Sequence, residues 1–329
     1  MTAPLSRRSL FLGAFALAAS PRSGLAQAVR AHRLGFLTLG SPDTAVVPLD
    51  AVREGLRSLG YAEGLNYMIE PRYALGRTEL LDGLASELVR SDVGLILTQT
   101  TPATVAAKKA SSTVPIVVIA SGDLVAAKVV ESLARPGGNV TGLSFLGTEL
   151  AEKQMEIIKL MAPRAKHVAL LASRTFLPEL NFFEQMRRTA PQLDVSVSFV
   201  ESAIPPDYPS AFREMTAANV DALVVASGNL NSPNWPDIID LTRRSALPAI
   251  YPVSEAVRAG GLVSYGINRA DFYRRAAEFV DRILRGVKPG DLPIRQPTQF
   301  ELAVNLRTAN VLGVNISQSI LVQANEIVD

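Results

Sequence analysis

The residues of this 329-residue chain that could do chemistry are small polar side chains, not acid–base or metal-binding groups. The chain has no cysteine and only two histidines, His32 and His167, which have no histidine partner three or four residues away. This argues against thiol catalysis, metal sites built from thiolates or histidines, and the usual histidine general base. A phosphate loop of the G-x-x-x-x-G-K-[ST] type and a G-x-S-x-G nucleophile elbow are also absent. We expect no catalytic residue, no metal and no cofactor.

Hydroxyl, glycine and amide residues follow most of the short apolar runs of the sequence. They occur in the segments 39–42, 98–102, 120–123, 172–175, 227–229, 251–255 and 266–268. Ligands of open α/β sheets bind beyond the carboxyl ends of the strands. If the apolar runs are strands, these segments are the loops in which a binding site should be found.

The segment 98–102 gives the strongest physical argument among these loops. A threonine N-cap at Thr100-Thr101 with a proline, Pro102, at the first helical position indicates a helix start. The free N–H groups and the positive end of the helix dipole would hold an anion such as a carboxylate there. A helix cap without a ligand has the same sequence, so the binding interpretation depends on the whole set of loops.

The elements that must position these loops alternate along the chain. Short, mostly continuous apolar runs at 33–38, 93–98, 115–120, 167–172, 195–200 and 222–226 are typical of strands buried on both faces of a parallel sheet. Helical periodicity appears between them, at 49–59, 79–89, 103–110, 149–161, 179–189, 208–217 and 236–245. This alternation predicts right-handed βαβ crossovers and doubly wound sheets.

The alternating pattern runs twice, which predicts two α/β lobes, each a doubly wound parallel sheet. We expect residues 29–145 and 266–296 to form lobe 1, and residues 146–265 and 297–329 to form lobe 2. Extended segments near 140–145, 262–265 and 296–305 follow turn-forming residues or, for the last, a helix predicted at 271–284. We therefore expect a hinge of three crossovers.

The first 28 residues predict export from the cytoplasm. Arg7 and Arg8 precede an uncharged apolar run at 10–19, and the small-residue triplet Ala26-Gln27-Ala28 follows it. This order is typical of a signal peptide cleaved after Ala28, by the twin-arginine or the general secretory route. The run is shorter than the roughly 20 apolar residues that span a bilayer. We expect a soluble periplasmic protein without a lipid anchor.

The overall composition is that of a folded protein without a nucleic-acid partner. Hydrophobic residues make up 48% of the chain and charged residues 19%, which is enough for a large core. The formal net charge is +2, and the arginines are scattered. A nucleic-acid surface needs clustered basic residues, so we expect no such partner.

Three sequence blocks resemble those of a known family. They are 136–144 (PGGNVTGLS), 259–266 (AGGLVSYG), and 273–277 (YRRAA) continuing to 296–302 (QPTQFEL) and Asn305-Leu306. In this order they are similar to ABC-transporter substrate-binding proteins of the tryptophan/tyrosine-binding-like group, which have the type I periplasmic-binding fold. The resemblance covers the whole mature chain. It implies a monomer that encloses an amino acid or another small carboxylate between two lobes, and an ABC permease with its ATPase as partners.

The resemblance also implies a set of ligand-binding residues. Our hypothesis for the mechanism is lobe closure, in which the ligand carboxylate would bind at the helix start of 101–102 and Tyr251 would pack against the body of the ligand. Two loops depart from the family pattern, at 123–124 and 173–176, which leaves the ligand class open; Arg174 would recognise an acidic group or simply be exposed. The expected binding residues are Gly40, Ser41, Thr100, Thr101, Ser121, Gly122, Asp123, Arg174, Ser227, Gly228, Tyr251 and Asn268.

Two other functions stay open at this point. A periplasmic binding subunit of a sensory system would use the same fold to present a ligand to a receptor kinase. An exported α/β enzyme is the second alternative, and the scarcity of histidine and the missing nucleophile motif count against it. A repressor-type ligand domain is disfavoured because an export signal occupies the place of a DNA-binding helix pair.

Overall fold

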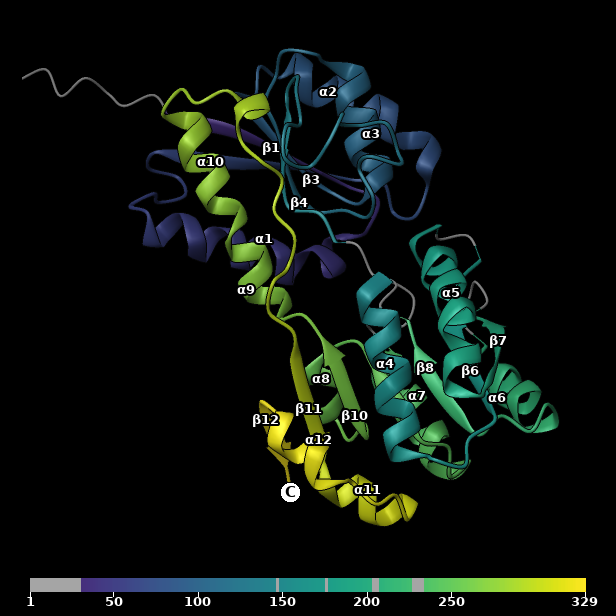
Figure 1. Ribbon diagram of the computed structural model, residues 1–329. Coiled ribbons are helices and arrows are strands. Elements are labelled where there is room, and N and C mark those ends of the chain that lie inside the picture. Colours follow the sequence, from purple (N-terminus) through teal and green to yellow (C-terminus); the bar gives the residue numbers. More distant parts are fainter. Residues whose placement is uncertain (1–30, 146–147, 175–176, 203–206, 227–233) are drawn as a thin grey trace, which may run out of the picture.

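The computed structural model describes residues 31–145, 148–174, 177–202, 207–226 and 234–329, and it forms two α/β lobes (Figure 1). The predicted signal peptide lies outside these residues. No helix of the described segments combines the length and the apolar character that crossing a bilayer requires. The two-lobe prediction is confirmed.

Lobe 1 is built on a five-stranded, wholly parallel sheet of order β2-β1-β3-β4-β5. The strands are β1 (His32–Thr38), β2 (Tyr67–Tyr73), β3 (Leu95–Gln99), β4 (Ile116–Ala120) and β5 (Val140–Gly142). The helices are α1 (Pro42–Ser58), α2 (Leu81–Arg90), α3 (Thr101–Ala110), α9 (Arg269–Arg274) and α10 (Ala276–Leu284), with short 3-10 turns η1 (Thr78–Leu80) and η4 (Pro289–Asp291). The last two helices return from the far end of the chain to pack on α1.

Lobe 2 is built on a seven-stranded sheet of order β12-β11-β10-β9-β8-β6-β7, in which only the β10–β11 pair is antiparallel. Its strands are β6 (His167–Ala172), β7 (Ser196–Glu201), β8 (Ala222–Val225), β9 (Ala249–Tyr251), β10 (Val263–Gly266), β11 (Glu301–Asn305) and β12 (Glu326–Val328). Its helices are α4 (Thr148–Met161), α5 (Leu177–Thr189), the 3-10 turn η2 (Ala190–Leu193), α6 (Tyr208–Ala217), α7 (Trp235–Arg244), α8 (Ser254–Arg258), α11 (Leu306–Leu312) and α12 (Gln318–Gln323).

Each sheet separates two apolar clusters, which explains why its central strands are continuously apolar. In β3, Leu95 and Leu97 enter one cluster of lobe 1 and Ile96 enters the other. In β6, Leu170 and Leu171 likewise belong to opposite clusters of lobe 2. Because packing on both faces holds each sheet in place, the loops at the carboxyl ends of its strands point in a fixed direction.

The chain leaves each sheet at a glycine that tolerates no side chain. A Cβ on Gly142, at the end of β5, would lie 2.2 Å from the Val118 carbonyl oxygen, and the glycine has φ of +126°. A Cβ on Gly266, at the end of β10, would lie 1.8 Å from the Pro252 carbonyl oxygen. The third crossing runs beside the first, because the Arg295 N–H donates to the Gly142 oxygen at 2.9 Å.

The sequence predicted most elements within a few residues, and three differences are informative. Strand β2 was missed because its side chains are mostly half-buried and it contains Pro71, which an edge strand tolerates. Helix α1 begins at Pro42, seven residues before the predicted start. The helix predicted over 271–284 is two helices, α9 and α10, with Arg275 as a turn between them.

Candidate functional site

Four of the predicted binding residues meet at the carboxyl edge of the lobe 1 sheet, where β3 and β4 end and α3 begins. The Thr101 and Ser121 hydroxyls lie 2.8 Å apart, and the Gly122 N–H donates to the Thr101 hydroxyl at 3.2 Å. The Thr100 N–H donates to the Ala120 carbonyl at 2.8 Å. The loops after two neighbouring strands therefore form one polar surface.

Thr100 has a strained backbone and an unsatisfied hydroxyl. Its φ is +86° and its ψ is 147°, a region that β-branched residues almost never adopt. Its Oγ1 is buried and has no hydrogen-bond partner in the described chain. Such strain costs about 1–3 kcal/mol and occurs at ligand clamps, where the surrounding structure enforces it. Both features make Thr100 a candidate for contact with a ligand.

The N-terminus of α3 is uncapped. Thr100 is the N-cap residue, Thr101 begins the helix and Pro102 is its second residue, one position later than the sequence suggested. The Thr100 side chain makes no capping hydrogen bond, and the N–H groups of Thr101 and Ala103 have no partner among the described residues. Free N–H groups at the positive end of a helix dipole bind anions. A ligand carboxylate fits this position.

Gly40 and Ser41 shape the neighbouring loop after β1. The Gly40 N–H donates to the Thr38 hydroxyl at 3.0 Å, and a Cβ on Gly40 would lie 2.4 Å from the Thr44 hydroxyl. The Ser41 hydroxyl and the Thr44 side chain form a capping box at the start of α1. Ser41 therefore has a helix-capping role in this structure, and its side chain is half-buried.

Asp123 ends the loop after β4. Its Oδ1 accepts hydrogen bonds from the N–H groups of Val125 and Ala126, both at 2.9 Å. Its Oδ2 has no partner in the described chain. One oxygen thus fixes the loop, and the other is available as a hydrogen-bond acceptor.

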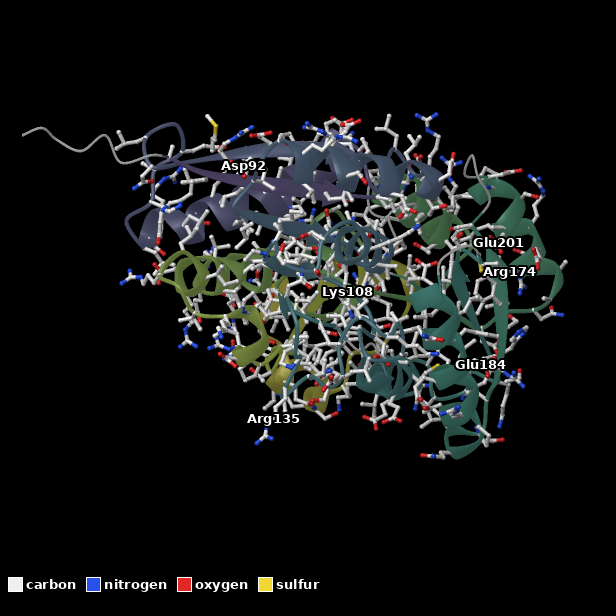
Figure 2. The ribbon with its side chains drawn as sticks, turned by 90° about the horizontal axis from the view of Figure 1, so that it is seen from above. Asp92, Lys108, Arg135, Arg174, Glu184 and Glu201 are labelled. Atoms are coloured by element: carbon white, nitrogen blue, oxygen red, sulfur yellow. The ribbon has the colours of Figure 1, made fainter. Side chains whose placement is uncertain are left out.

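Arg174 in lobe 2 is already paired. Its backbone N–H donates to Glu201 Oε1 at 3.0 Å and its Nε lies 3.3 Å from Glu201 Oε2. Figure 2 shows Arg174 and Glu201 close together. The Arg174 Cζ also lies 4.3 Å from the centre of the Phe199 ring. An acidic ligand group would have to compete with Glu201 for this guanidinium.

Tyr251 ends β9, but its side chain lies in the core of lobe 2. It is fully buried within β9, its hydroxyl lies 3.2 Å from the Thr242 hydroxyl, and its ring meets Trp235 edge to face at 5.9 Å. Burial raises the pKa of the phenol far above its usual value, although the Thr242 hydrogen bond opposes this. Tyr251 is a neutral core residue here, so the expectation that it packs on the ligand is corrected.

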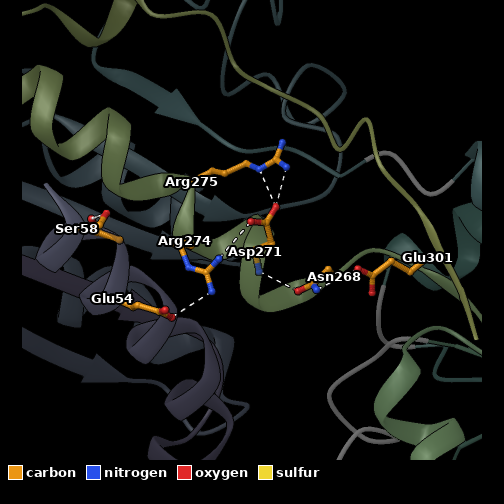
Figure 3. A network of polar contacts seen from close by, with 8 residues as sticks. Glu54, Ser58, Asn268, Asp271, Arg274, Arg275 and Glu301 are labelled. Carbon is orange, nitrogen blue, oxygen red and sulfur yellow. Dashed lines mark hydrogen bonds and ion pairs between the residues drawn. The ribbon is translucent and has the colours of Figure 1, made fainter. Parts of the chain in front are cut away.

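The remaining predicted residues do not join the polar surface of lobe 1. Asn268 lies on the hinge, where its Oδ1 caps α9 by accepting from the Asp271 N–H at 3.0 Å and its Nδ2 donates to Glu301 at 3.1 Å (Figure 3). Ser227 and Gly228 lie outside the described residues. The described residues also contain no group of three or more His, Asp or Glu side chains that could hold a metal ion.

A family model matches residues 41–328, and it describes an ABC transporter substrate binding protein. The chain belongs to this family. The resemblance drawn from the three sequence blocks is confirmed, and so is the type I periplasmic-binding fold.

Individual relatives agree with this assignment. The substrate-binding protein is 27% identical over 277 residues to a tyrosine-binding protein of Clostridioides difficile strain R20291, covering 81% of this chain and 77% of the relative. It is 25% identical to an ABC domain from Streptococcus pneumoniae solved in complex with L-Trp, with a TM-score of 0.80, covering 91% of this chain and all of that one. A conserved domain protein of Vibrio cholerae has the same fold, with 24% identity, a TM-score of 0.81 and the same coverage.

The sequence analysis missed the residues that hold Thr100 in place in this substrate-binding protein. The buried Thr98 and Thr104 hydroxyls lie 2.9 Å apart, and the Thr104 hydroxyl donates to the Thr100 carbonyl at 3.0 Å. The Gln99 side chain accepts from the Thr38 hydroxyl at 3.3 Å. The only sequence feature that could have indicated these residues is the run of threonines around Pro102.

We predict that Arg174→Ala changes ligand affinity by less than about two-fold and lowers stability by about 0.5–1 kcal/mol, because an exposed ion pair and ring contact are lost. Chemical denaturation and calorimetric titration would measure the two effects. Arg188→Ala on α5 is the matched control, because Arg188 is exposed and forms no ion pair with another described residue. A ten-fold loss of affinity would instead make Arg174 a direct ligand contact.

Proposed function

We propose that this protein is the extracytoplasmic solute-binding protein of an ABC importer. It closes its two lobes around an amino acid, or another small carboxylate, and delivers it to a membrane permease. The observation that carries the proposal is the uncapped N-terminus of α3 with the buried, unsatisfied Thr100 hydroxyl beside it. These donors converge on a position suited to a carboxylate.

An amino acid fits the whole polar surface better than a simple carboxylate. Thr100 and the N–H groups of Thr101 and Ala103 supply donors, whereas Asp123 Oδ2 supplies an acceptor for an ammonium group. Thr101 and Ser121 join the two loops, so donors and acceptor are held on one rigid edge. The names of the relatives, one tyrosine-binding and one solved with L-Trp, support the same class.

The mechanism is a change of conformation without covalent chemistry. In this proposal lobe 1 comprises residues 29–145 and 266–296, and lobe 2 comprises residues 146–265 and 297–329. A ligand held by lobe 1 gains contacts with lobe 2 only in the closed state, so binding shifts the hinge equilibrium. The closed form then docks on the permease. The predicted signal peptide of residues 1–28 supports a periplasmic location.

The test is a thermal-shift screen of the mature chain from Val29, refolded to remove any carried ligand. The panel contains amino acids, aromatic acids, dicarboxylates, nucleosides and sugars. At 100 times Kd, a native-state ligand adds about 2.7 kcal/mol of stability. We expect a saturable shift from amino acids, with the compound recovered intact.

A pair of variants shows whether the shift comes from the proposed site. Replacing Thr100 and Thr101 together by alanine should abolish most of the shift while the protein stays folded. Thr216→Ala on α6 is the control, because this threonine lies in the other lobe and its hydroxyl only donates to Phe212. An undiminished shift in the double variant would show that the ligand carboxylate does not bind at the start of α3.

A further inference from the structure

Gln99 is a polar residue at the carboxyl edge of lobe 1 that the sequence analysis did not predict as a binding residue. It is the last residue of β3, the central strand of the five-stranded sheet, and its side chain is half-buried. It directly precedes Thr100, and across the sheet it pairs with Thr38 at the end of β1. Gln99 therefore lies between the loop after β1 and the start of α3, two of the segments that form the candidate site.

Two hydrogen bonds fix which way the Gln99 amide faces. The Gly40 N–H donates to the Thr38 hydroxyl at 3.0 Å, and that hydroxyl donates to Gln99 Oε1 at 3.3 Å. Thr38 is only 1% exposed. If the amide were turned over, the Thr38 oxygen would face two donors and its own proton would lose this acceptor, which is costly for a buried hydroxyl. The amide oxygen therefore stays on Thr38, and the NH2 group points away from it.

The NH2 group of Gln99 is free to donate to a bound molecule. Its Nε2 forms no hydrogen bond with the described residues, and it is not buried, so a small molecule can reach it. Because the amide oxygen is held by Thr38, the part of Gln99 that is left for a ligand is a donor. This group therefore recognises a hydrogen-bond acceptor and not a hydrogen-bond donor.

The Gln99 amide is offset from the proposed carboxylate position. The Thr98 hydroxyl contacts Thr104 on α3, and side chains alternate along a strand, so Gln99 faces the other side of the sheet, that of α1 (Figure 1). Thr38 also holds Gln99 on the β1 side of β3, whereas Asp123 follows β4 on the opposite side. The edge of the sheet thus presents the Gln99 donor, the start of α3 and the Asp123 acceptor in that order.

We propose that Gln99 binds the side chain of the ligand and makes the protein selective for amino acids whose side chain carries a hydrogen-bond acceptor. The inference rests on the proposed function, in which the start of α3 holds the ligand carboxylate and Asp123 its ammonium group. These two groups occupy the β3 and β4 part of the edge, so the side chain is what remains to extend toward β1. A hydroxyl, carbonyl or carboxylate oxygen there accepts from Nε2. A hydrocarbon in the same place would remove water from Nε2 without replacing its hydrogen bond.

The first test compares amino acids of similar shape that differ in the acceptor, using the wild-type protein. The pairs are L-threonine with L-valine, L-asparagine with L-leucine, L-glutamine with L-methionine, and L-tyrosine with L-phenylalanine. Calorimetric titration gives the ratio of affinities within each pair. In the pair that binds best we expect a preference of at least about ten-fold for the acceptor-bearing member, because a site built to hydrogen-bond a group rejects the analogue that lacks it. Equal affinities, or a preference for the apolar member, overturn the proposal.

The second test removes the donor. Gln99→Met keeps the length of the side chain, and we expect it to reduce the preference to less than about three-fold, mainly through weaker binding of the acceptor-bearing member. Loss of the acceptor for Thr38 lowers the Tm as well, but a general loss of stability weakens both members alike and leaves their ratio unchanged. A ratio that survives in Gln99→Met overturns the role of Gln99.

Gln323→Met on α12 is the matched control. The Gln323 amide donates to the Ser319 carbonyl at 2.7 Å, on an exposed helix of lobe 2. The same change of side chain there should leave the affinity ratio at the wild-type value.

Failure of this inference and failure of the proposed function give different results. If the wild-type protein binds no amino acid, the proposed function fails and this inference fails with it. If the protein binds an amino acid without the acceptor preference, or with a preference that Gln99→Met leaves intact, only the role of Gln99 is overturned.

Discussion

Replacing Thr100 with glycine is expected to make the protein more stable and its ligand binding much weaker. The backbone at this residue has φ of +86°, which glycine adopts without strain. Relief of about 1–3 kcal/mol exceeds the entropic cost of glycine, about 0.5–1 kcal/mol, so the net gain should be about 1 kcal/mol. For a chain of this size that corresponds to a rise in Tm of about 2 °C.

The loss of binding follows from the hydroxyl that the same change removes. A hydrogen bond to a charged group contributes about 1.5–3 kcal/mol, so the apparent Kd should rise about 10- to 100-fold. Calorimetric titration measures the affinity, and a melting curve without ligand measures the stability. Few single substitutions raise the stability of a protein and lower its ligand affinity. This result would therefore show that the strained backbone of Thr100 serves ligand binding.

Two controls separate the causes. Thr100→Ser keeps the hydroxyl and should keep most of the affinity. Ala246→Gly relieves another left-handed residue, with φ of +48°, at the end of α7, and it should stabilise the protein without changing its affinity. If Thr100→Gly bound the ligand as well as wild type, or melted at a lower temperature, then the strained hydroxyl would have no part in binding.

The position of Thr100 could be predicted from the sequence, and its conformation could not. The Thr-Thr-Pro order indicates a helix start, and the apolar run before it indicates the strand that delivers it to the edge of the sheet. The positive φ arises because the Thr100 N–H must reach the Ala120 carbonyl on β4, a contact between strands that no local pattern encodes. Tertiary hydrogen bonding overrides local preference here.

The predictions for Tyr251 and Asn268 differ from the structure for a related reason. Counting residues from the end of an apolar run places a side chain near the edge of a sheet, but it does not say whether that side chain faces the core. Tyr251 is the last residue of the three-residue strand β9 and enters the apolar cluster with Trp235. The Asn268 side-chain amide donates a hydrogen bond to Glu301, which is 33 residues away in the sequence. Partners so distant in sequence are fixed only by the fold.

Gly266→Ala, at the hinge, is expected to abolish the native fold at 37 °C. Its Cβ would lie 1.8 Å from the Pro252 oxygen and 2.8 Å from the Pro252 carbonyl carbon, which are backbone atoms that no side-chain rotation can move. Relieving the overlap requires β10 and the 252–254 segment to separate, and β10 is the strand from which the chain crosses to lobe 1. A cost above about 4–5 kcal/mol is a large share of the roughly 5–15 kcal/mol that stabilises a typical protein.

The measurement is the soluble yield and the Tm of Gly266→Ala beside those of Gly83→Ala. Gly83 lies in α2 with no atom within 4 Å of the added Cβ, so the same change there should stabilise the protein by about 0.5–1 kcal/mol. The contrast isolates the close backbone approach from any general preference for glycine. A Gly266→Ala protein with the wild-type Tm would mean that Pro252 and β10 are not in contact, and that the lobe 2 end of this crossing is not rigid.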